Sequence, residues 1–391
     1  MNLFELTKAL MSIPSTSGEE EAVGVFLGDH LRSLGWTVEL QEAGAATLSP
    51  GARTLSSSSK EDKSMGTGAR TLSSSSKEDK QMGTGVSPLR AEKEQMGTGV
   101  SPLRQFNVIA TLNDTPRVWL STHMDTVPPY IPPTEDDERI YGRGACDAKG
   151  IIASQITAAE RLRAEGVEDI GLLFTVEEER ASTGAKAANL HPLAAKCEYL
   201  INGEPTDNEL AIGSKGTFRL NIKTAGKAAH SAYPEEGESA IEKLLDILED
   251  VRHTRLPNDE FFGETTVNIG TIEGGLALNV IAPAAEAGLA IRLTTKREPI
   301  EDAIRNIVRD RGEVEVLSAS EPVKMLAVDG FKQKVVRFTT DIPHLPNWGQ
   351  PLLIGPGSIL VAHTKDEFVL KKDLETAVDL YVDLAKALLA R

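Results

Sequence analysis

Histidine and acidic residues follow apolar segments of this sequence at several places along the chain. His123 and Asp125 come directly after the apolar run at 118–120, and Asp147 precedes a helix-like segment. A strand that ends in such residues, followed by an acid at the start of a helix, is how an α/β sheet builds a site at its carboxyl edge. This stretch therefore predicts the first half of a metal centre.

Three further candidate ligands, Glu179, Glu204 and His363, each follow a later apolar run. Two imidazoles and three carboxylates suit Zn2+. Five protein groups are about the number needed by two ions that share a bridging carboxylate and a water. Asp147 lies between the two halves of this set and is the candidate for the bridge.

Each candidate also has an ordinary structural explanation. A histidine after a strand is more often a hydrogen-bonded structural residue than a ligand, and residues 177–179 could form a solvated acidic turn. However, these adjacent carboxylates would repel one another unless a cation or a proton separates their roles, so one can ligate while its neighbour acts as a general base. Asp125 is better explained as an acid that receives the imidazole N–H of His123 than as a ligand. Cys146 is interpreted as a packed thiol.

The elements expected to position these residues alternate between strands and helices. Strands are predicted at 36–40, 106–110, 118–120, 170–176 and 198–201, and a helix is predicted at 150–164. This alternation favours an α/β fold with a mostly parallel sheet covered on both faces. We expect the strand at 106–110 to pair with those at 36–40 and 118–120.

From about Leu210 the pattern changes to alternating strands around one amphipathic helix. Strands are predicted at 217–224, 265–272 and 285–293, and the helix at 239–252. This pattern is typical of a small α+β domain inserted into a larger one. We predict a larger α/β domain in two parts, at 1–208 and 319–391, with a small α+β domain inserted at 209–318.

Residues 44–104 differ from the rest of the chain because they contain repeated, apolar-poor sequence. The sequence of 51–63 recurs at 68–80, and that of 81–90 recurs at 95–104. Each repeat has almost no apolar residue that could stack in a solenoid. We therefore expect a disordered, repeat-bearing insertion without a catalytic role.

Composition narrows the class of protein. The formal net charge of -16 argues against nucleic acid or an anionic membrane as a partner, because both would repel such a surface. Cys146 and Cys197 cannot form a disulfide framework, which favours a reducing cytoplasm. No apolar run approaches the length of a membrane span, and the N-terminus lacks a signal-peptide pattern. A cytoplasmic protein is therefore expected.

Several motifs resemble those of the M20 metallopeptidase family, which includes acetylornithine deacetylase, succinyl-diaminopimelate desuccinylase, aminoacylase and carboxypeptidase G. The motifs are STHMDTVP (121–128), GRGACDAKG (142–150), VEEERASTGA (176–185), NGEPT (202–206), AAHSAYPEEGESAI (228–241), GGLALNVIAP (274–283) and GPGSILVAHTKDEF (355–368). The resemblance covers essentially the whole chain except 44–104, and several motifs in the right order make it specific.

The resemblance implies a set of ligands for two Zn2+ ions per subunit, for which Co2+ can substitute. His123 and Glu204 would hold one ion, Glu179 and His363 the other, and Asp147 would bridge them.

The resemblance also implies catalytic roles for two acids near these ligands. Glu178 matches the family's general base, and Asp125 matches the acid that orients a histidine. Counting back from Gly184 in the family's D-E-E-x-G-S-x-G-A pattern assigns Glu179 as the ligand and Glu178 as the base.

The resemblance implies that the larger domain is a zinc-hydrolase catalytic domain and that the inserted domain at 209–318 is the family's lid and dimerisation domain. Residues of this lid domain match positions that contact substrate in the family. His230 matches a residue that stabilises the oxyanion, in some members from the partner subunit, and Asn279 and Arg292 resemble positions that bind the substrate's carboxylate side. The chain departs from the pattern at Ala181, where Gly is usual, and at residues 282–283, where Pro-Asp is usual. An ordinary surface salt bridge is the other explanation for Arg292.

We therefore expect a dinuclear zinc-dependent hydrolase that cleaves the amide bond of N-acyl amino acids, in the manner of acetylornithine deacetylase, or of small peptides with a free carboxylate. Such an enzyme would serve amino-acid metabolism and form a homodimer through the lid domain. The alternative is a non-catalytic binding protein on the same scaffold. That alternative predicts loss of ligands or base, whereas all five ligands and Glu178 are present.

Overall fold

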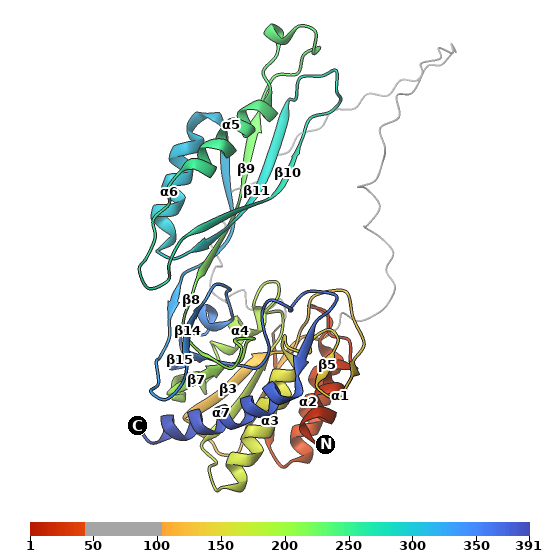
Figure 1. The fold of residues 1–391 in the computed structure, drawn as a ribbon, viewed down its shortest axis with the longest axis vertical. Helices are drawn as coiled ribbons and strands as arrows, with labels where there is room; N and C mark the ends of the chain where they lie inside the picture. The colour runs from red at the N-terminus through yellow and green to blue at the C-terminus, as the bar shows by residue number, and fades with distance from the viewer. Residues whose placement is uncertain (44–103) are drawn as a thin grey trace, which may run out of the picture. The chain divides into compact units, whose positions relative to one another are not determined.

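The computed structural model describes residues 1–43 and 104–391 (Figure 1). The insertion expected at 44–104 therefore lies outside the described residues, apart from its last residue. The strands of the described part form three sheets of nine, four and three strands.

Several predicted site residues lie at or just after the ends of strands in the nine-stranded sheet. Its strands follow the order β1-β2-β6-β3-β7-β15-β8-β13, with β14 beside β8. Their bounds are β1 (Thr37–Glu42), β2 (Phe106–Thr111), β3 (Val118–His123), β6 (Ile170–Thr175), β7 (Tyr199–Asn202), β8 (Leu210–Ser214), β13 (Val323–Lys324), β14 (Gln333–Val336) and β15 (Gln350–Leu353). The four central strands β6, β3, β7 and β15 are mutually parallel. This arrangement confirms the predicted α/β class with a mostly parallel central sheet.

Apolar clusters cover both faces of this sheet. Successive side chains of a strand point to opposite faces, so a strand whose residues are all apolar packs on both sides. Val118 and Leu120 of β3 pack into the larger apolar cluster, whereas Trp119 between them packs into a second cluster with Trp348. The larger cluster is formed with α1 (Leu3–Met11), α2 (Glu21–Ser33), α3 (Lys149–Ala164) and α7 (Lys371–Leu389), and the second includes residues of α4 (Thr183–Ala188). Helices α3 and α7 lie side by side in Figure 1.

One strand pairing differs from the sequence-based expectation. Strand β2 pairs with β1, as predicted, but its other neighbour is β6 and not β3. The prediction was wrong because it assumed that strands adjacent in sequence are adjacent in the sheet. The chain instead crosses from β3 through α3 to β6, and β6 occupies the place beside β2.

The four-stranded sheet is wholly antiparallel in the order β10-β11-β9-β12. Its elements are β9 (Gly216–Ala225), α5 (Ala240–His253), β10 (Thr266–Gly274), β11 (Ala284–Leu293), α6 (Arg297–Val308) and β12 (Glu313–Ser320). Helix α5 buries Leu244, Ile247, Leu248 and Val251, the spacing of one helical face, against β9 and β11. The three predicted strands and the helix at 239–252 are present, whereas α6 and β12 were not anticipated. The predicted domain boundaries at 209 and 318 stay a prediction.

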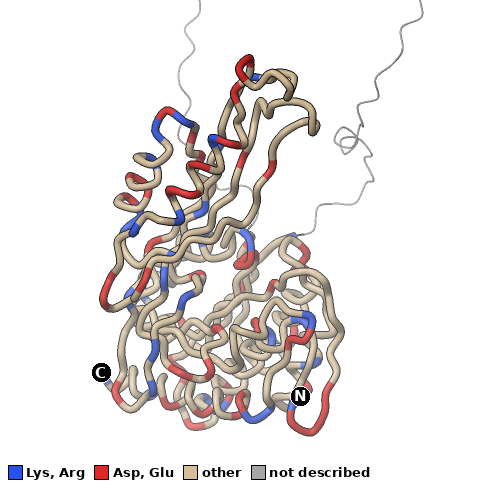
Figure 2. Tube along the Cα trace, turned by 45° about the horizontal axis from the view of Figure 1, so that its top comes forward, with Lys and Arg blue, Asp and Glu red and all other residues tan. Residues whose placement is uncertain are grey.

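The third sheet is small and joins β4 (Thr134–Glu135), β5 (Arg139–Tyr141) and β16 (Phe368–Leu370). Acidic and basic positions are interspersed along the helices and loops of the described chain (Figure 2). Among the helices of residues 1–43 and 104–391, none combines the length and the apolar character that crossing a membrane requires.

Candidate metal centre and active site

The predicted ligands lie at one edge of the nine-stranded sheet because the central strands run in the same direction. His123 is the last residue of β3, and Glu179 and Glu204 follow the ends of β6 and β7. His363 lies in the segment between β15 and β16, and Asp147 lies just before α3. The carboxyl ends of parallel strands meet at one edge, so residues far apart in sequence converge there.

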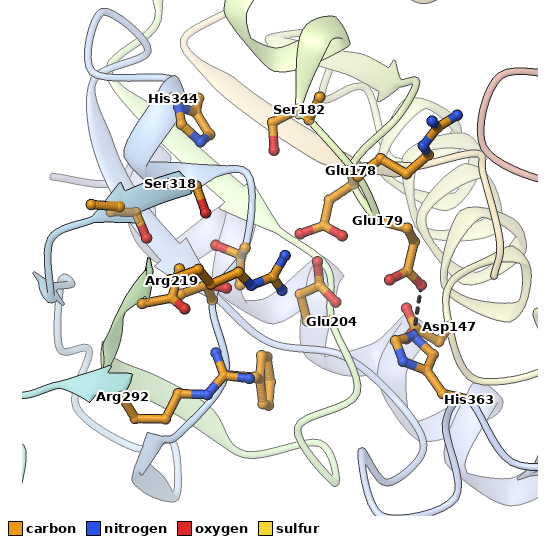
Figure 3. A pocket seen from close by; sticks show the side chains of 18 of the residues that line it. Asp147, Glu178, Glu179, Ser182, Glu204, Arg219, Arg292, Ser318, His344 and His363 are labelled. Carbon is orange, nitrogen blue, oxygen red and sulfur yellow. Dashed lines mark hydrogen bonds and ion pairs between the residues drawn. The ribbon is translucent and has the colours of Figure 1, made fainter. Parts of the chain in front are cut away.

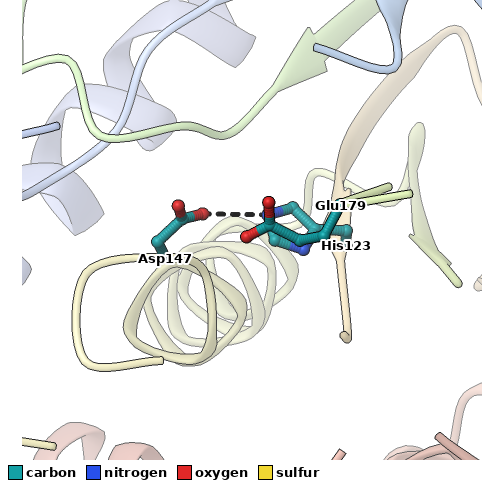
Figure 4. Close-up of side chains that lie close together, drawn as sticks. All are labelled: His123, Asp147 and Glu179. Carbon is teal, nitrogen blue, oxygen red and sulfur yellow. Dashed lines mark hydrogen bonds and ion pairs between the residues drawn. The ribbon is translucent and has the colours of Figure 1, made fainter. Parts of the chain in front are cut away.

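Asp147 lies between the two histidines, and each of its carboxylate oxygens faces one of them. Its Oδ1 atom is 3.0 Å from His123 Nε2, and its Oδ2 atom is 3.1 Å from His363 Nε2. Figure 4 shows Asp147 facing His123, and Figure 3 shows Asp147 beside His363. A carboxylate that presents one oxygen to each of two ligand sets has the arrangement that a bridge between two ions requires.

Glu179 belongs to the close group around Asp147, and Glu204 lines the same cavity. Glu179 Oε1 is 2.7 Å from His363 Nε2, and ligand atoms of His123, Asp147 and Glu179 lie within 4.8 Å of one another. Glu204 is 4% exposed, and its Oε1 atom has no hydrogen-bond partner among the described residues. Buried carboxylate oxygens are normally paired. An unpaired one beside three other metal-binding groups fits a cation.

The protonation preferences of the cluster indicate the same need for positive charge. Burial by itself lowers the pKa of His123, but its contacts with Asp125 and Asp147 raise that pKa well above its usual value. Contacts with Asp147 and Glu179 raise the pKa of His363 to about 10. Burial raises the pKa of Glu204 well above its usual value, and Asp147 and Glu179 add to this effect. The acids thus retain protons on neighbouring imidazoles, and a divalent cation can replace that positive charge.

Asp125 is fully buried and holds several parts of the site together. It faces His123 Nδ1 with Oδ1 at 3.3 Å, and its backbone carbonyl lies 3.0 Å from the same nitrogen. Its carboxylate also accepts hydrogen bonds from the backbone N–H groups of Glu178 and Glu179 at 3.0 and 3.2 Å. Asp125 therefore lies behind His123 and also contacts the acidic turn, a contact that the sequence did not indicate.

The acidic turn after β6 presents two of its three glutamates to the cavity. Glu177 has a φ of 58°, a left-handed conformation that a non-glycine residue adopts at a cost of about 1–2 kcal/mol. Its side chain turns away and accepts a hydrogen bond from Thr183 Oγ1 at 2.6 Å. Glu178 and Glu179 line the cavity instead. Burial raises the pKa of Glu178 well above its usual value, and the nearby carboxylate of Glu204 raises it further.

A buried ion pair shapes the segment that leads to Asp147. Glu367 accepts a hydrogen bond from Arg143 at 2.6 Å and backbone N–H bonds from Gly144, Cys146 and Asp147 at 3.0 to 3.3 Å. Burial raises the pKa of the Cys146 thiol well above its usual value, which agrees with a packed thiol. Arg143 and Glu367 lie in motifs that the sequence identified, but their shared task was not inferred.

A cavity of about 440 Å³ opens at the candidate metal centre (Figure 3). Asp147, Glu178, Glu179, Glu204 and His363 line one part of it, and residues of the four-stranded sheet line another. Arg292 is among those residues and was predicted. His230 and Asn279 are exposed and are not part of this lining. A backbone hydrogen bond of 3.0 Å from Ser231 to Asn279 holds their two loops together.

Comparison with known proteins identifies the family. The sequence profile of the peptidase family M20/M25/M40 matches residues 119–387. An M20 domain-containing protein of Schizosaccharomyces pombe is 35% identical over 97% of this chain and 83% of its own length. The chain belongs to the M20 peptidase family. The predicted family membership is confirmed, and this M20 chain is a hydrolase of a metal-dependent peptidase family.

Other relatives and solved structures agree with this assignment. A protein of Aspergillus terreus named probable carboxypeptidase is 38% identical over 72% of the M20 chain and 74% of its own length. A tripeptidase of Staphylococcus aureus superposes with a TM-score of 0.72 at 19% identity, over 100% of this chain and 98% of its own. An M20 family metallo-carboxypeptidase of Sulfolobus solfataricus superposes with a TM-score of 0.63 at 15% identity, over 98% of both chains. At these identities, the solved structures show a shared fold.

Arg219 is among the cavity residues for which the sequence indicated no role. Arg219 lines the cavity from β9, where it alternates with the buried Phe218 and Leu220. An arginine at an outward position of an amphipathic strand is usually just a solvated residue, so the sequence held only a weak signal. The pairing of β9 with β11 brings Arg219 close to Arg292.

Proposed function

We propose that this M20 hydrolase binds two Zn2+ ions per subunit and cleaves the amide bond of N-acyl amino acids or small peptides with a free carboxylate. The observation that carries the proposal is Asp147, which presents one oxygen to His123 and the other to His363, at 3.0 and 3.1 Å. His123 and Glu204 would hold one ion, and Glu179 and His363 the other. Glu204 Oε1 has no hydrogen-bond partner within residues 1–43 and 104–391, which supports a role for this oxygen as a ligand.

When bound, the ions would polarise the scissile carbonyl and make water more acidic. In the proposed mechanism, the Glu178 carboxylate accepts a proton from the attacking water and returns it to the departing amine. Burial and the neighbouring Glu204 raise the pKa of Glu178, which makes its carboxylate a stronger proton acceptor than an ordinary glutamate. Asp125 positions Glu178 and Glu179 through their backbone N–H groups and orients His123.

The substrate's carboxylate requires a cation in the same cavity, and we propose Arg292 for this role. Arg292 is half-buried on β11 and lines the cavity opposite the acidic cluster. A guanidinium can bind a carboxylate through two parallel hydrogen bonds. The name carboxypeptidase given to the Aspergillus terreus relative is consistent with this proposal.

We propose that a homodimer formed through the four-stranded-sheet region completes the site, with His230 stabilising the oxyanion and Asn279 contacting substrate. Support comes from the exposed positions of both residues outside the cavity lining. Nearby, Leu276 and Leu278 are 75% and 105% exposed, and such apolar surface is common at interfaces. Sedimentation velocity of the wild type and of Leu278→Asp would test the dimer. A monomeric wild type would refute it.

The central test combines metal analysis with a substrate panel. Purified protein replenished with zinc or cobalt should contain two ions per chain by mass spectrometry and release amine from N-acetylornithine, other N-acyl amino acids or dipeptides. Blocking the substrate's carboxylate as an amide should abolish the release. Fewer than two ions and no turnover on the panel would instead favour a non-catalytic binding protein. Deacetylase activity and a cytoplasmic location stay predictions.

A further inference from the structure

Arg219 and Arg292 lie on the same face of the four-stranded sheet. In the antiparallel register of β9 and β11, Arg219 is opposite Ala290 and Thr217 is opposite Arg292. The two arginines are therefore diagonal neighbours, a relation in which long side chains reach each other. The intervening Phe218 points to the other face and packs in the core formed with α5 and α6. Strand alternation thus directs both guanidinium groups away from that core.

Neither guanidinium has an acidic partner within residues 1–43 and 104–391, as judged by the hydrogen bonds and ion pairs of that part of the chain. The cross-strand neighbours explain this, because Arg219 lies opposite Ala290 and Ser318, and Arg292 opposite Thr217 and Thr266. None of these four residues is charged.

Lys223 is a cation on the same strand that does have acidic partners, and it provides a comparison for Arg219. It lies four residues after Arg219 on β9, and therefore on the same face of the sheet. Its ammonium group is 2.7 Å from Glu315 and 3.8 Å from Glu286. The sheet therefore supplies acids for Lys223 but not for Arg219. Unpaired adjacent cations are unfavourable, so their retention inside a cavity points to an anionic ligand.

The cavity itself is divided by charge. The acidic cluster lies at one side and the two arginines at another, with their guanidinium groups directed into the space between (Figure 3). Burial lowers the pKa of Arg292, and repulsion by the neighbouring charge of Arg219 lowers it further. Arg292 also borders a second cavity of about 440 Å³, whose wall includes Lys215 and Arg337.

The number of cations exceeds what one carboxylate needs. A single α-carboxylate forms a two-bond pair with one guanidinium and leaves the other without a partner. A second carboxylate on the same residue would satisfy the second guanidinium. The surrounding wall adds hydroxyl groups, including Ser320 Oγ, which is buried without a hydrogen-bond partner among the described residues.

We propose that Arg219 and Arg292 form a two-cation subsite that selects substrates with an acidic C-terminal residue, aspartate or glutamate. Arg292, which is half-buried and therefore more firmly held, binds the α-carboxylate that all substrates share. Arg219, which is exposed and freer to adjust, binds the side-chain carboxylate. The inference rests on the proposed amide hydrolysis at the adjacent acidic cluster and names the class of residue that is released.

Matched substrates test the subsite directly. Zinc-loaded full-length protein is assayed with Ala-Glu against Ala-Gln, and with N-acetylglutamate against N-acetylglutamine. These pairs differ by one charge at nearly equal size. Wild-type kcat/KM should favour the acidic member by about 10- to 100-fold, the value of one charge-assisted contact. In Arg219→Gln this preference should fall to within about threefold, because the acidic member loses a charge-assisted contact that the glutamine member does not make.

Two further variants separate the roles of the arginines. Arg292→Gln should lower kcat/KM for both members of a pair alike, because each keeps its α-carboxylate. Lys223→Gln removes a cation from the same strand outside the cavity lining and should retain the wild-type preference.

The outcomes distinguish this inference from the proposed function. If wild type hydrolyses glutamine-ended and glutamate-ended substrates equally well, or if Arg219→Gln slows both equally, the two-cation subsite is refuted while amide hydrolysis stands. If no substrate of either kind is cleaved by metal-loaded protein, the proposed function itself fails. Loss of the preference in Arg219→Gln, with unchanged metal content, would support the subsite.

Discussion

Asp125 Oδ1 accepts a hydrogen bond from the backbone N–H of Glu178 at 3.0 Å. The second oxygen of Asp125 accepts from the Ser17 hydroxyl at 2.6 Å and from the backbone N–H of Glu179 at 3.2 Å. Because the same carboxylate also faces His123, one buried acid fixes a candidate ligand and the candidate base relative to each other.

Replacing Asp125 with asparagine should lower metal affinity or kcat/KM about 10- to 100-fold, the usual effect of losing a carboxylate behind a metal-binding histidine. The asparagine amide group would bring an N–H donor into a place where the neighbouring groups already donate. Isothermal titration with zinc and steady-state kinetics measure the effect. Ser17→Ala removes only one donor to Asp125 and should cost far less. Equal effects of the two substitutions would contradict this account.

Glu178→Gln should retain both metal ions and lose about 10²- to 10⁴-fold in kcat, because the amide cannot accept the proton of the attacking water. Metal content by mass spectrometry and turnover are measured on the same sample. Glu177→Gln is the matched control, since Glu177 turns its side chain to Thr183 and can be replaced by another acceptor there. Normal turnover in Glu178→Gln would refute the assigned base.

Metal removal should destabilise the protein more strongly as the pH rises. The folded state raises the pKa values of Glu178, Glu204, His123 and His363, so these groups favour folding when protonated. That contribution is lost as the pH rises through the raised values, whereas the lowered pKa of Asp147 acts in the opposite sense only in acid. The rise in Tm on adding zinc should therefore grow between about pH 6.5, the ordinary pKa of histidine, and about pH 10, the raised pKa of His363. A calorimetric series with and without chelator would show it, and a constant difference would oppose it.

Arg143→Met should reduce the free energy of unfolding by about 3–5 kcal/mol, because it leaves the buried Glu367 carboxylate without its cation. The segment that ends at Asp147 would also lose order, so metal affinity should fall together with stability. Urea unfolding of the zinc-loaded protein measures the first effect. The double variant Arg143→Met with Glu367→Gln should recover part of the loss. No recovery would show that the charge of Glu367 is not the cause.

Deleting residues 50–102 should preserve activity. The segment connects β1 to β2, whose residues Glu42 and Phe106 are direct antiparallel partners, so a short connection can join them. Loop-closure entropy changes slowly with length, and the free energy of unfolding should change by no more than about 1–2 kcal/mol. Turnover and urea unfolding of the shortened protein provide the test. Loss of turnover with an intact fold would assign the segment a functional role.

The sequence by itself determined the class of fold and the identity of the candidate ligands. Apolar runs that end in His123, Glu179 or Glu204 indicate strands of an α/β sheet with their polar residues at one edge. This inference works because local periodicity and the position of a residue after a strand are properties of the chain order. The same reasoning failed for β2, whose neighbour in the sheet is β6, since strand order depends on the path of the crossover helix.

Only the tertiary structure decided how these residues meet. It placed one oxygen of Asp147 against His123 and the other against His363, and it left Glu204 Oε1 without a hydrogen-bond partner in the described part of the chain. It also brought Arg219 beside Arg292 through the register of β9 against β11. The two arginines are separated by 72 residues in the sequence, and no local pattern specifies that register. Distances of a few ångströms between remote residues arise from packing and strand pairing, and these interactions are not encoded in any single local segment.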